Sequence, residues 1–257
     1  MISTGELTQY LDDILEIAAV PDYPGALNGL QFANQGRVTS VAAAVDFSGR
    51  TVSAAAAAGA DLLLVHHGMF WSGAQAITGH AYERLRTLIE KDIAVYSAHL
   101  PLDRHQDFGN NVLLSRQLGL DPSGEFASYK GKSVGVRGEA EIGTAEIVRR
   151  ARAFAEQHGG TAIATPFPEN RRTVRWAICT GAGASAESLQ EAVDTGVDTL
   201  IVGEGPHWTA VQAADVGIAI IYAGHYATET LGVAALAKHL AERFDLELTV
   251  VDAPTGL

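Results

Sequence analysis

Residues 59–68 read GADLLLVHHG, and residues 196–205 read GVDTLIVGEG. The two segments share their first glycine, an aspartate two positions later, an apolar run and a closing glycine. A continuous apolar run of this length is typical of a strand that is buried on both faces of a parallel sheet. The pair therefore predicts an internal duplication built around two equivalent buried strands.

A second pair of segments extends the duplication. VYSAH at 95–99 aligns with IYAGH at 221–225, and a carboxylate follows each histidine four residues later, at Asp103 and Glu229. Alternation of strands and helices alone can imitate part of such a match, but it does not usually reproduce polar positions. We therefore expect His99 and His225 to be equivalent.

Apolar strand patterns alternate with helical patterns along the chain, which is typical of an α/β fold with mostly parallel pairing. We expect helices at 5–19, 50–58, 82–91, 111–118, 144–158, 185–195, 207–215 and 228–243. We expect strands at 41–45, 61–65, 93–97, 174–179, 197–202, 218–222 and 247–251. The pattern predicts two closely packed α/β repeats, 1–125 and 126–257, either as two halves or as one continuous domain. Residues 121–173 look less regular.

Composition excludes several classes of protein. The 257 residues are 47% hydrophobic, and no apolar run reaches the roughly 18 residues that a membrane-spanning helix needs. The N-terminal segment is acidic, unlike a secretory signal, and a single cysteine, Cys179, fits a reducing compartment. The net charge of −12 opposes binding to a nucleic acid backbone. We expect a cytoplasmic protein without membrane or nucleic acid partners.

The histidines lie where an α/β sheet binds ligands, beyond the carboxyl ends of its strands. His66 and His67 follow one predicted strand, and His99 and His225 follow two others. Adjacent residues of a strand point to opposite faces, so His66 and His67 are expected to converge only if the chain has already left the strand. Gly68 makes a turn at that point plausible. Together these side chains predict a metal site.

The carboxylates complete the predicted ligand set. His225 and Glu229 have the spacing that places two side chains on one helical face, which suits a histidine ligand and a carboxylate that bridges two metals. Pro101 permits helix only in a first turn, so Asp103 follows a backbone turn, and His99 is either a ligand or an outer-shell partner. Histidine and carboxylate ligands suit Zn, Mn, Fe or Ni.

Other residues have a structural reading beside a functional one. Glu204 takes the place of His67 in the second repeat and is either a catalytic acid/base or a loop carboxylate. Residues 180–185, TGAGAS, either cradle a phosphate or simply connect a strand to a helix. Residues 206–208, PHW, either stack on a planar ring or pack locally. Structural roles are expected for the remaining single histidines His80, His105, His158 and His239.

Longer motifs resemble the Nif-three-like dinuclear-metal proteins, a family also known as GTP cyclohydrolase 1 type 2. They are HHGMFW at 66–71, AHLPLD at 98–103, GNN at 109–111 and GHYATE at 224–229, with NGLQ at 28–31 and CTGAG at 179–183 in support. The resemblance spans nearly the whole chain. It is to the short form of the family, because there is no room for the domain that longer members insert between the halves.

The resemblance implies two intertwined α/β repeats with mixed, mostly parallel sheets, assembled as a ring-shaped homohexamer. It also implies two divalent metal ions per subunit, of Zn, Fe, Mn, Ni or Mg, facing an internal cavity. The implied ligands are His66, His67, Asp103, His225 and Glu229, with Glu229 bridging and His99 close by. One departure is that an aspartate expected before Asn28 is absent.

Two functions are compatible with these residues. The first is a metal-dependent hydrolase of a small nucleotide-like or heterocyclic substrate, such as GTP, with His99 or Glu204 moving the proton. The alternative is a non-catalytic hexamer that stores, delivers or senses metal or acts as a scaffold. Because only the first repeat contains the His66-His67 pair, we expect one composite two-metal site at the junction of the halves.

Overall fold

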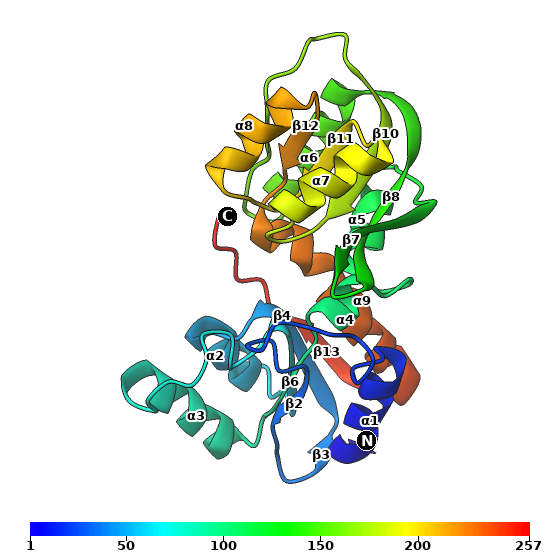
Figure 1. Cartoon of the computed structure of the whole chain (residues 1–257). Helices are drawn as coiled ribbons and strands as arrows, with labels where there is room; N and C mark the ends of the chain where they lie inside the picture. The colour runs from blue at the N-terminus through cyan, green and yellow to red at the C-terminus, as the bar shows by residue number, and fades with distance from the viewer. The chain divides into compact units, whose positions relative to one another are not determined.

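The computed structural model describes all residues, 1–257, and shows a mixed α/β protein with mostly parallel sheets (Figure 1). Its packing divides the chain into two compact units, which we describe one at a time. The first contains Met1–Leu102 and Gly232–Ala253, and the second contains Asp103–Leu231 and Pro254–Leu257. The sequence suggested a boundary at residue 125. The packing instead divides the chain after Leu102, and residues 232–253 return to the first unit, where the last strand of the chain pairs within the first sheet.

The first unit is built on a five-stranded sheet in the order β13-β4-β5-β6-β2. Four of its strands run parallel, and β2 pairs antiparallel with β6 at one edge. Their bounds are β2 (Gly29–Phe32), β4 (Ser40–Asp46), β5 (Leu62–His67), β6 (Ala94–Ser97) and β13 (Glu247–Val250). A separate short pair joins β1 (Ile2–Ser3) to β3 (Arg37–Val38).

Helices cover both faces of this sheet. On one face α2 (Gly49–Ala57) and α3 (Gly79–Lys91) pack their buried side chains against β4, β5 and β6 (Figure 1). On the other face lies α1 (Thr4–Ile14), where Asp12 accepts a hydrogen bond from the Tyr96 hydroxyl at 2.7 Å. Helix α9 (His225–Phe244) begins in the second unit and ends in the first. None of the helices is long and apolar enough to cross a membrane.

The second unit is built on a six-stranded sheet in the order β7-β8-β10-β11-β12-β9. Strands β10, β11 and β12 are parallel, and the others are antiparallel to their neighbours. The strand bounds are β7 (Gly124–Tyr129), β8 (Lys132–Gly143), β9 (Ile163–Ala164), β10 (Arg172–Cys179), β11 (Thr199–Val202) and β12 (Ala219–Tyr222). The helices are α4 (Leu100–Asp103), which starts at the boundary of the units, α5 (Asn110–Gln117), α6 (Thr144–Gln157), α7 (Ala186–Thr195) and α8 (His207–Asp215).

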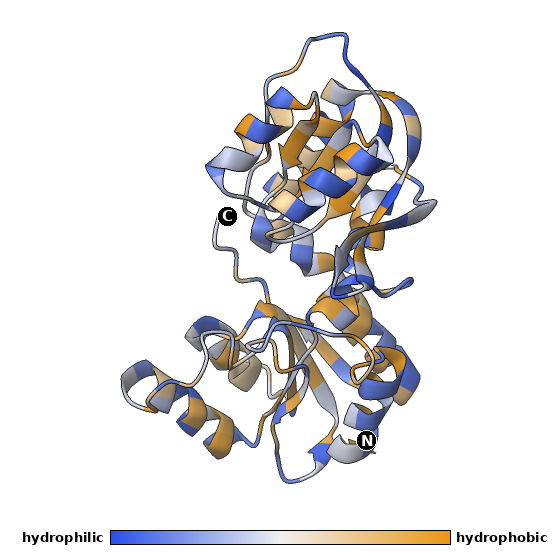
Figure 2. Ribbon diagram, in the orientation of Figure 1, coloured by the Kyte–Doolittle hydropathy of each residue, from blue (hydrophilic) through white to orange (hydrophobic).

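The core of the second unit lies between this sheet and helices α5 and α6. Trp176 of β10 is fully buried there, among Ile178, Ile201 and Ile221 of the parallel strands and Phe154 of α6. Figure 2 shows hydrophobic residues gathered on the strands of this sheet. These apolar strands hold the loops at their carboxyl ends in fixed positions.

The structure supports the internal duplication at several polar positions. Asp61 and Asp198 precede equivalent strands, and each carboxylate accepts two backbone hydrogen bonds from the start of the neighbouring strand. The donors are Thr39 and Ser40 in the first unit, at 2.6 and 3.2 Å, and Val174 and Arg175 in the second, at 2.9 and 2.7 Å. Helices α2 and α7 both start with a serine capping box, at Ser48 and Ser185. Chance periodicity does not explain this agreement.

The expected equivalence of His99 and His225 is wrong by one residue. Strands β5 and β6 pair from their first residues, and so do β11 and β12. Counted from the start of β6 and of β12, His99 corresponds to Gly224, and His225 comes one residue later. Gly224 has φ +90, a conformation that glycine adopts readily, and it accommodates the additional residue.

Two elements differ from expectation for local reasons. Helix α1 ends at Ile14 instead of residue 19, and Glu16 has φ 52, which a right-handed helix does not contain. The region around 130 is a regular β7–β8 hairpin. Its two-residue turn, Lys130-Gly131, has positive φ at both positions, as a type I′ turn requires. Lysine is an uncommon first residue of such a turn, so the sequence signal was weak.

Candidate metal centre

Three imidazoles form a compact group in the first unit. His66, His67 and His99 each offer a nitrogen within 4.8 Å of the others, and all three residues are largely buried. The ring centroids of His66 and His67 are 4.8 Å apart, as are those of His66 and His99. The three histidines predicted to lie near one another in the first half of the sequence are therefore together, and Asp103, the fourth residue predicted there, belongs to the second unit.

The two adjacent histidines converge without leaving the strand. Strand β5 extends to His67, which pairs with Asp46 of β4 and accepts a hydrogen bond from Phe47 N–H at 2.9 Å. The expectation that the two rings converge only after the chain has left the strand is therefore wrong, because the strand continues through His67 and ends before Gly68. The ladder to β4 holds both histidines at the very end of the sheet.

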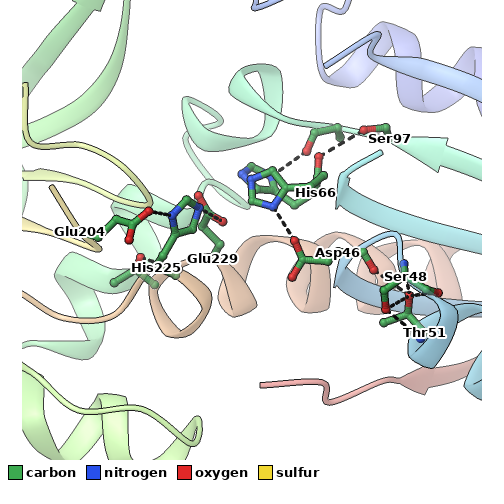
Figure 3. Close-up of polar contacts among 11 residues, drawn as sticks. Asp46, Ser48, Thr51, His66, Ser97, Glu204, His225 and Glu229 are labelled. Atoms are coloured by element: carbon green, nitrogen blue, oxygen red, sulfur yellow. Dashed lines mark hydrogen bonds and ion pairs between the residues drawn. The ribbon is translucent and has the colours of Figure 1, made fainter. Parts of the chain in front are cut away.

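Each of the three rings is oriented through its Nδ1 atom by an oxygen acceptor. His66 Nδ1 lies 2.8 Å from the carbonyl oxygen of Ala98, and His67 Nδ1 lies 2.9 Å from Asp46 Oδ1 (Figure 3). His99 Nδ1 lies 2.9 Å from Asp22 Oδ1. Because these oxygens accept hydrogen bonds, the Nδ1 atoms donate, and the lone pair of each neutral ring resides on Nε2. This is the tautomer that metal-ligating histidines adopt with a carboxylate or carbonyl behind them.

Asp22 organises the loop that faces His99. Its Oδ2 accepts hydrogen bonds from the Asn28 amide at 2.7 Å and from Leu100 N–H at 2.9 Å, while Asn28 accepts one from His99 N–H at 2.7 Å. Burial by itself would raise the pKa of Asp22, but the hydrogen bond and charge of His99 and the Asn28 contact lower it below its usual value. The sequence lacks the aspartate expected just before Asn28, and Asp22 brings a carboxylate to Asn28 from six residues away.

Gln31 fixes the turn that follows the two histidines. Its Oε1 accepts a hydrogen bond from Met69 N–H at 2.6 Å, and its amide donates to the carbonyls of Ala26 and Leu27. A Cβ on Gly68 would collide with the Gln31 amide, so this close approach requires glycine. Two motifs quoted from the sequence, residues 28–31 and 66–71, therefore pack directly on each other.

The second unit holds one imidazole between two carboxylates. His225 Nδ1 lies 2.8 Å from Glu204 Oε1, and His225 Nε2 lies 3.1 Å from Glu229 Oε2 (Figure 3). Burial disfavours the protonated ring, but the hydrogen bonds and charges of Glu229 and Glu204 outweigh it and raise the pKa of His225 to about 9. In the metal-free chain a proton thus occupies the His225–Glu229 contact at neutral pH, where a metal ion would compete with it.

Helix α9 and a glycine together position Glu229. His225 and Glu229 are the first and fifth residues of the helix and share one face, as their spacing predicted. Glu229 is only 3% exposed, and Gly181 passes so close that a Cβ there would overlap Glu229 Oε1. Gly181 N–H donates to Thr228 Oγ1 at 3.1 Å, which ties the loop to the helix.

Asp103 is buried near the end of β10. Its Oδ1 accepts hydrogen bonds from Asn110 at 2.8 Å and from Thr180 at 3.5 Å, and Asn111 donates to its backbone carbonyl at 3.2 Å. A Cβ on Gly109 would collide with the carbonyls of Asp103 and His105, so the GNN motif is a support for Asp103.

Cys179 is an unsuitable ligand. Burial raises the pKa of its thiol to about 12, and the charges of Asp103 and Glu229 add to this effect. The thiol therefore stays protonated, which agrees with a site made of histidine and carboxylate ligands.

The glycine-rich segment 180–185 is a connection whose amides are used within the chain. Thr180 N–H donates to Asn111, Gly181 N–H to Thr228, and Ala184 N–H to the Glu204 carbonyl. These amides are not directed at a phosphate. The structural reading of this segment is the better one.

Comparison with known proteins assigns the family. The model for Duf34/NIF3 (NGG1p interacting factor 3) matches residues 2–255. The chain belongs to the Duf34/NIF3 family. A GTP cyclohydrolase 1 type 2 homolog from Deinococcus radiodurans is 39% identical over 262 residues, covering 100% of this chain and 95% of the relative. A protein of the same name from Archaeoglobus fulgidus is 37% identical over 258 residues, covering 100% of both proteins.

Solved structures of similar proteins have the same fold as this NIF3 family chain. TTHA1606 from Thermus thermophilus is 35% identical with a TM-score of 0.84, and the match covers 100% of both chains. A structural genomics target described as protein ybgI, of unknown function, is 35% identical with a TM-score of 0.88 and the same coverage. The mixed α/β fold expected from the sequence is therefore confirmed.

Sequence reasoning missed two residues of this NIF3 family site, Asp22 and Asp46. Each sits behind a histidine and contacts its Nδ1 atom. Asp46 was detectable in principle, because it ends the strand beside β5 at the same edge of the sheet. Asp22 had no such signal, since a turn-rich segment gives no register from which its neighbours can be inferred.

Asp46→Asn should weaken binding of Zn²⁺ by about ten- to a hundredfold, the usual cost of losing a carboxylate behind a ligating histidine. Asparagine keeps an oxygen near Nδ1 of His67 but lacks the charge that makes the ring a stronger ligand. Competition with a chromophoric chelator measures the affinity. Asp215→Asn, at an exposed position at the end of α8, is the control. Equal affinity of both variants and the parent would contradict a metal role for His67.

Proposed function

We propose that this chain is a hydrolase that binds two divalent metal ions and acts on a small nucleotide-like or heterocyclic substrate. One observation carries the proposal: four imidazoles, of His66, His67, His99 and His225, each have Nδ1 held by a carboxylate or carbonyl oxygen. A histidine with only a structural role has no need of this arrangement, so four occurrences in one chain are unexpected. In a metal-ligating histidine the arrangement fixes the tautomer and strengthens the Nε2 lone pair.

The proposed ligands are His66, His67, Asp103, His225 and Glu229, with Glu229 as the bridging carboxylate. Their mixture of imidazole and carboxylate donors suits Zn, Mn, Fe or Ni more than Mg, which prefers oxygen donors throughout. Asp103 and Glu229 are 7% and 3% exposed, and buried carboxylates are costly unless a cation or hydrogen bonds compensate them. Bound cations would provide that compensation.

His99 and Glu204 are the proposed proton carriers. When bound, divalent ions polarise a substrate oxygen and make water acidic enough to react near neutral pH. His99 is fixed by Asp22 at Nδ1, so its Nε2 is the atom that would accept and return a proton. Glu204 is 48% exposed on its side chain and contacts His225 Nδ1, so it is accessible to solvent and coupled to a proposed ligand.

The substrate class rests on the names of the relatives, GTP cyclohydrolase 1 type 2 homologs, and GTP is the first compound to test. The net charge of −12 gives the chain itself no general attraction for a triphosphate, so the metal ions would have to provide it. We further propose a ring-shaped homohexamer, which sedimentation of the purified protein would test.

The deciding experiment is metal analysis of the purified protein, followed by turnover assays of the loaded protein with nucleotides and pterin-like compounds. The hydrolase proposal expects His99→Gln and Glu204→Gln, assayed with enough Zn²⁺ to fill the site in spite of any loss of affinity, to hold the parent's metal content and lose turnover. Glu242→Gln, an exposed position on α9, is the control. If the loaded parent turns over none of these compounds, the alternative of a non-catalytic metal-storing or regulatory hexamer replaces the enzyme.

A further inference from the structure

Two large aromatic side chains stand exposed beside the three-histidine group of the first unit. Trp71 is 43% exposed and Tyr23 is 49% exposed, although neither belongs to the proposed ligand set. Single exposed apolar residues are common on protein surfaces and need no explanation. These two are different, because both contact the same imidazole.

The rings of Trp71, Tyr23 and His99 lie together, and we call this group the aromatic corner. The Trp71 centroid lies 4.6 Å from that of His99 with the planes at 65°, and 5.0 Å from that of His67. The Tyr23 centroid lies 6.3 Å from that of Trp71 at 71°, and 6.1 Å from that of His99. Two exposed aromatic rings thus stand at 71° to each other, next to His67, a proposed ligand, and His99, a proposed proton carrier.

The backbone that presents this corner is held in place. Gly25 lies against the carbonyls of Phe70 and Trp71, where a Cβ would collide with the Trp71 oxygen. On one side Gln31 accepts from Met69 N–H, and on the other Tyr23 N–H donates to Asp22 at 2.7 Å. The two loops are thus fixed by specific contacts while their aromatic rings face solvent. A surface organised in this way is prepared for a ligand before the ligand arrives.

We propose that Tyr23 and Trp71 bind a planar aromatic ring of the ligand and hold it beside the His66–His67–His99 group. Rings at right angles offer a third ring one face and one edge, which are the two favoured aromatic contacts. This inference deepens the proposed function and rests on it for the adjacent metal ions. The substrate is then a compound in which a single or fused heteroaromatic ring carries the reacting group.

Tryptophan fluorescence tests the binding directly. The chain has three tryptophans: Trp176 is fully buried, Trp208 is 41% exposed in the second unit, and Trp71 is in the corner. In a Trp208→Phe background, Trp71 is therefore the accessible emitter. We expect guanosine to quench the emission of the Zn²⁺-loaded protein, and ribose 5-phosphate, which has no aromatic ring, to leave it unchanged. Equilibrium dialysis gives the affinity independently of fluorescence.

Variants of the corner decide whether Trp71 is responsible. In the parent sequence, Trp71→Leu should weaken guanosine binding about tenfold, within the range measured for loss of base stacking, and Trp71→Phe should retain most of it. Tyr23→Leu should weaken it as well. Metal content should stay at the parent level in Trp71→Phe, so that the comparison with the parent remains valid even if the leucine variant binds less metal.

Three results would overturn the proposal: no binding of guanosine to the parent, equal affinity in Trp71→Leu, or a change of assembly state in Trp71→Leu seen by sedimentation. The last result would place the ring in an interface between copies of the chain. Binding of guanosine with no turnover of any compound in the panel would leave this inference standing and refute the hydrolase. Turnover with unchanged affinity in Trp71→Leu would refute this inference and leave the hydrolase standing.

Discussion

Glu229→Gln should lose most of the bound metal, with an affinity for Zn²⁺ at least about a hundredfold below the parent, the upper end of what loss of a supporting carboxylate costs. Glutamine has nearly the same shape but no charge, and Glu229 is 3% exposed, so solvent cannot replace the missing carboxylate. The contact of His225 Nε2 with Glu229 Oε2 shows that both atoms are directed at the same small region.

The same substitution changes the protonation of His225 in a stated direction. Glu229 contributes more than Glu204 to raising the pKa of His225 to about 9, so its neutralisation should lower that pKa toward the ordinary value for histidine. The metal-free parent therefore keeps His225 protonated up to about pH 9, and the variant releases the proton at lower pH. NMR titration of the imidazole measures this shift even in protein that holds no metal.

Elemental analysis of the purified variant gives the metal content, with Glu242→Gln on the same helix as the control. Glu242 is exposed and contacts only the flexible end of Lys238 in the ion pair at 3.8 Å, so the control should keep the parent's metal. A Glu229→Gln variant that keeps two ions per chain would refute the bridging assignment. Loss of metal in both variants would point to general destabilisation of α9 instead.

The fold was accessible from sequence because the duplication repeats polar positions as well as apolar ones. Asp61 and Asp198 each accept backbone hydrogen bonds from the neighbouring strand, so they occupy equivalent positions and mark how the two repeats align. The alignment of the two repeats is wrong after β12. Gly224 is an additional residue there, and aligning His99 with His225 hides it. The pairing of β13 with β4 was equally hidden, since it joins segments about 200 residues apart.

The candidate site was accessible only in part. Ligand types at strand ends follow a general rule of α/β sheets, so the histidines and Glu229 could be named from spacing. The residues that orient them could not, because the hydrogen bond that His99 donates to Asp22 depends on the path of an irregular loop. The aromatic corner could not be predicted for the same reason. Tyr23 and Trp71 are 48 positions apart, and their loops approach each other closely because Gly25 has no side chain to collide with the Trp71 carbonyl.

Gly181→Ala should displace Glu229 from its position, although no proposed ligand is itself substituted. Gly181 has φ +61, which costs an L-residue roughly 1 to 3 kcal/mol, and the new methyl group would overlap Glu229 Oε1. The carboxylate has little room to yield, because the loop is tied to α9 by the Gly181–Thr228 hydrogen bond. We expect a lower melting temperature together with a loss of metal comparable to that of Glu229→Gln.

The matched control for this variant is Gly143→Ala, in the same unit at the N-terminus of α6. Gly143 has φ −62, and no atom lies within 4 Å of the position that a Cβ would take, so alanine fits there without strain. Differential scanning fluorimetry with and without Zn²⁺ separates the two effects in Gly181→Ala. The backbone strain lowers the melting temperature in both conditions, whereas displacement of Glu229 removes the additional stabilisation that Zn²⁺ gives the parent. If Zn²⁺ stabilises Gly181→Ala as much as it stabilises the parent, Glu229 does not bind the ion in the position that the Gly181 loop defines.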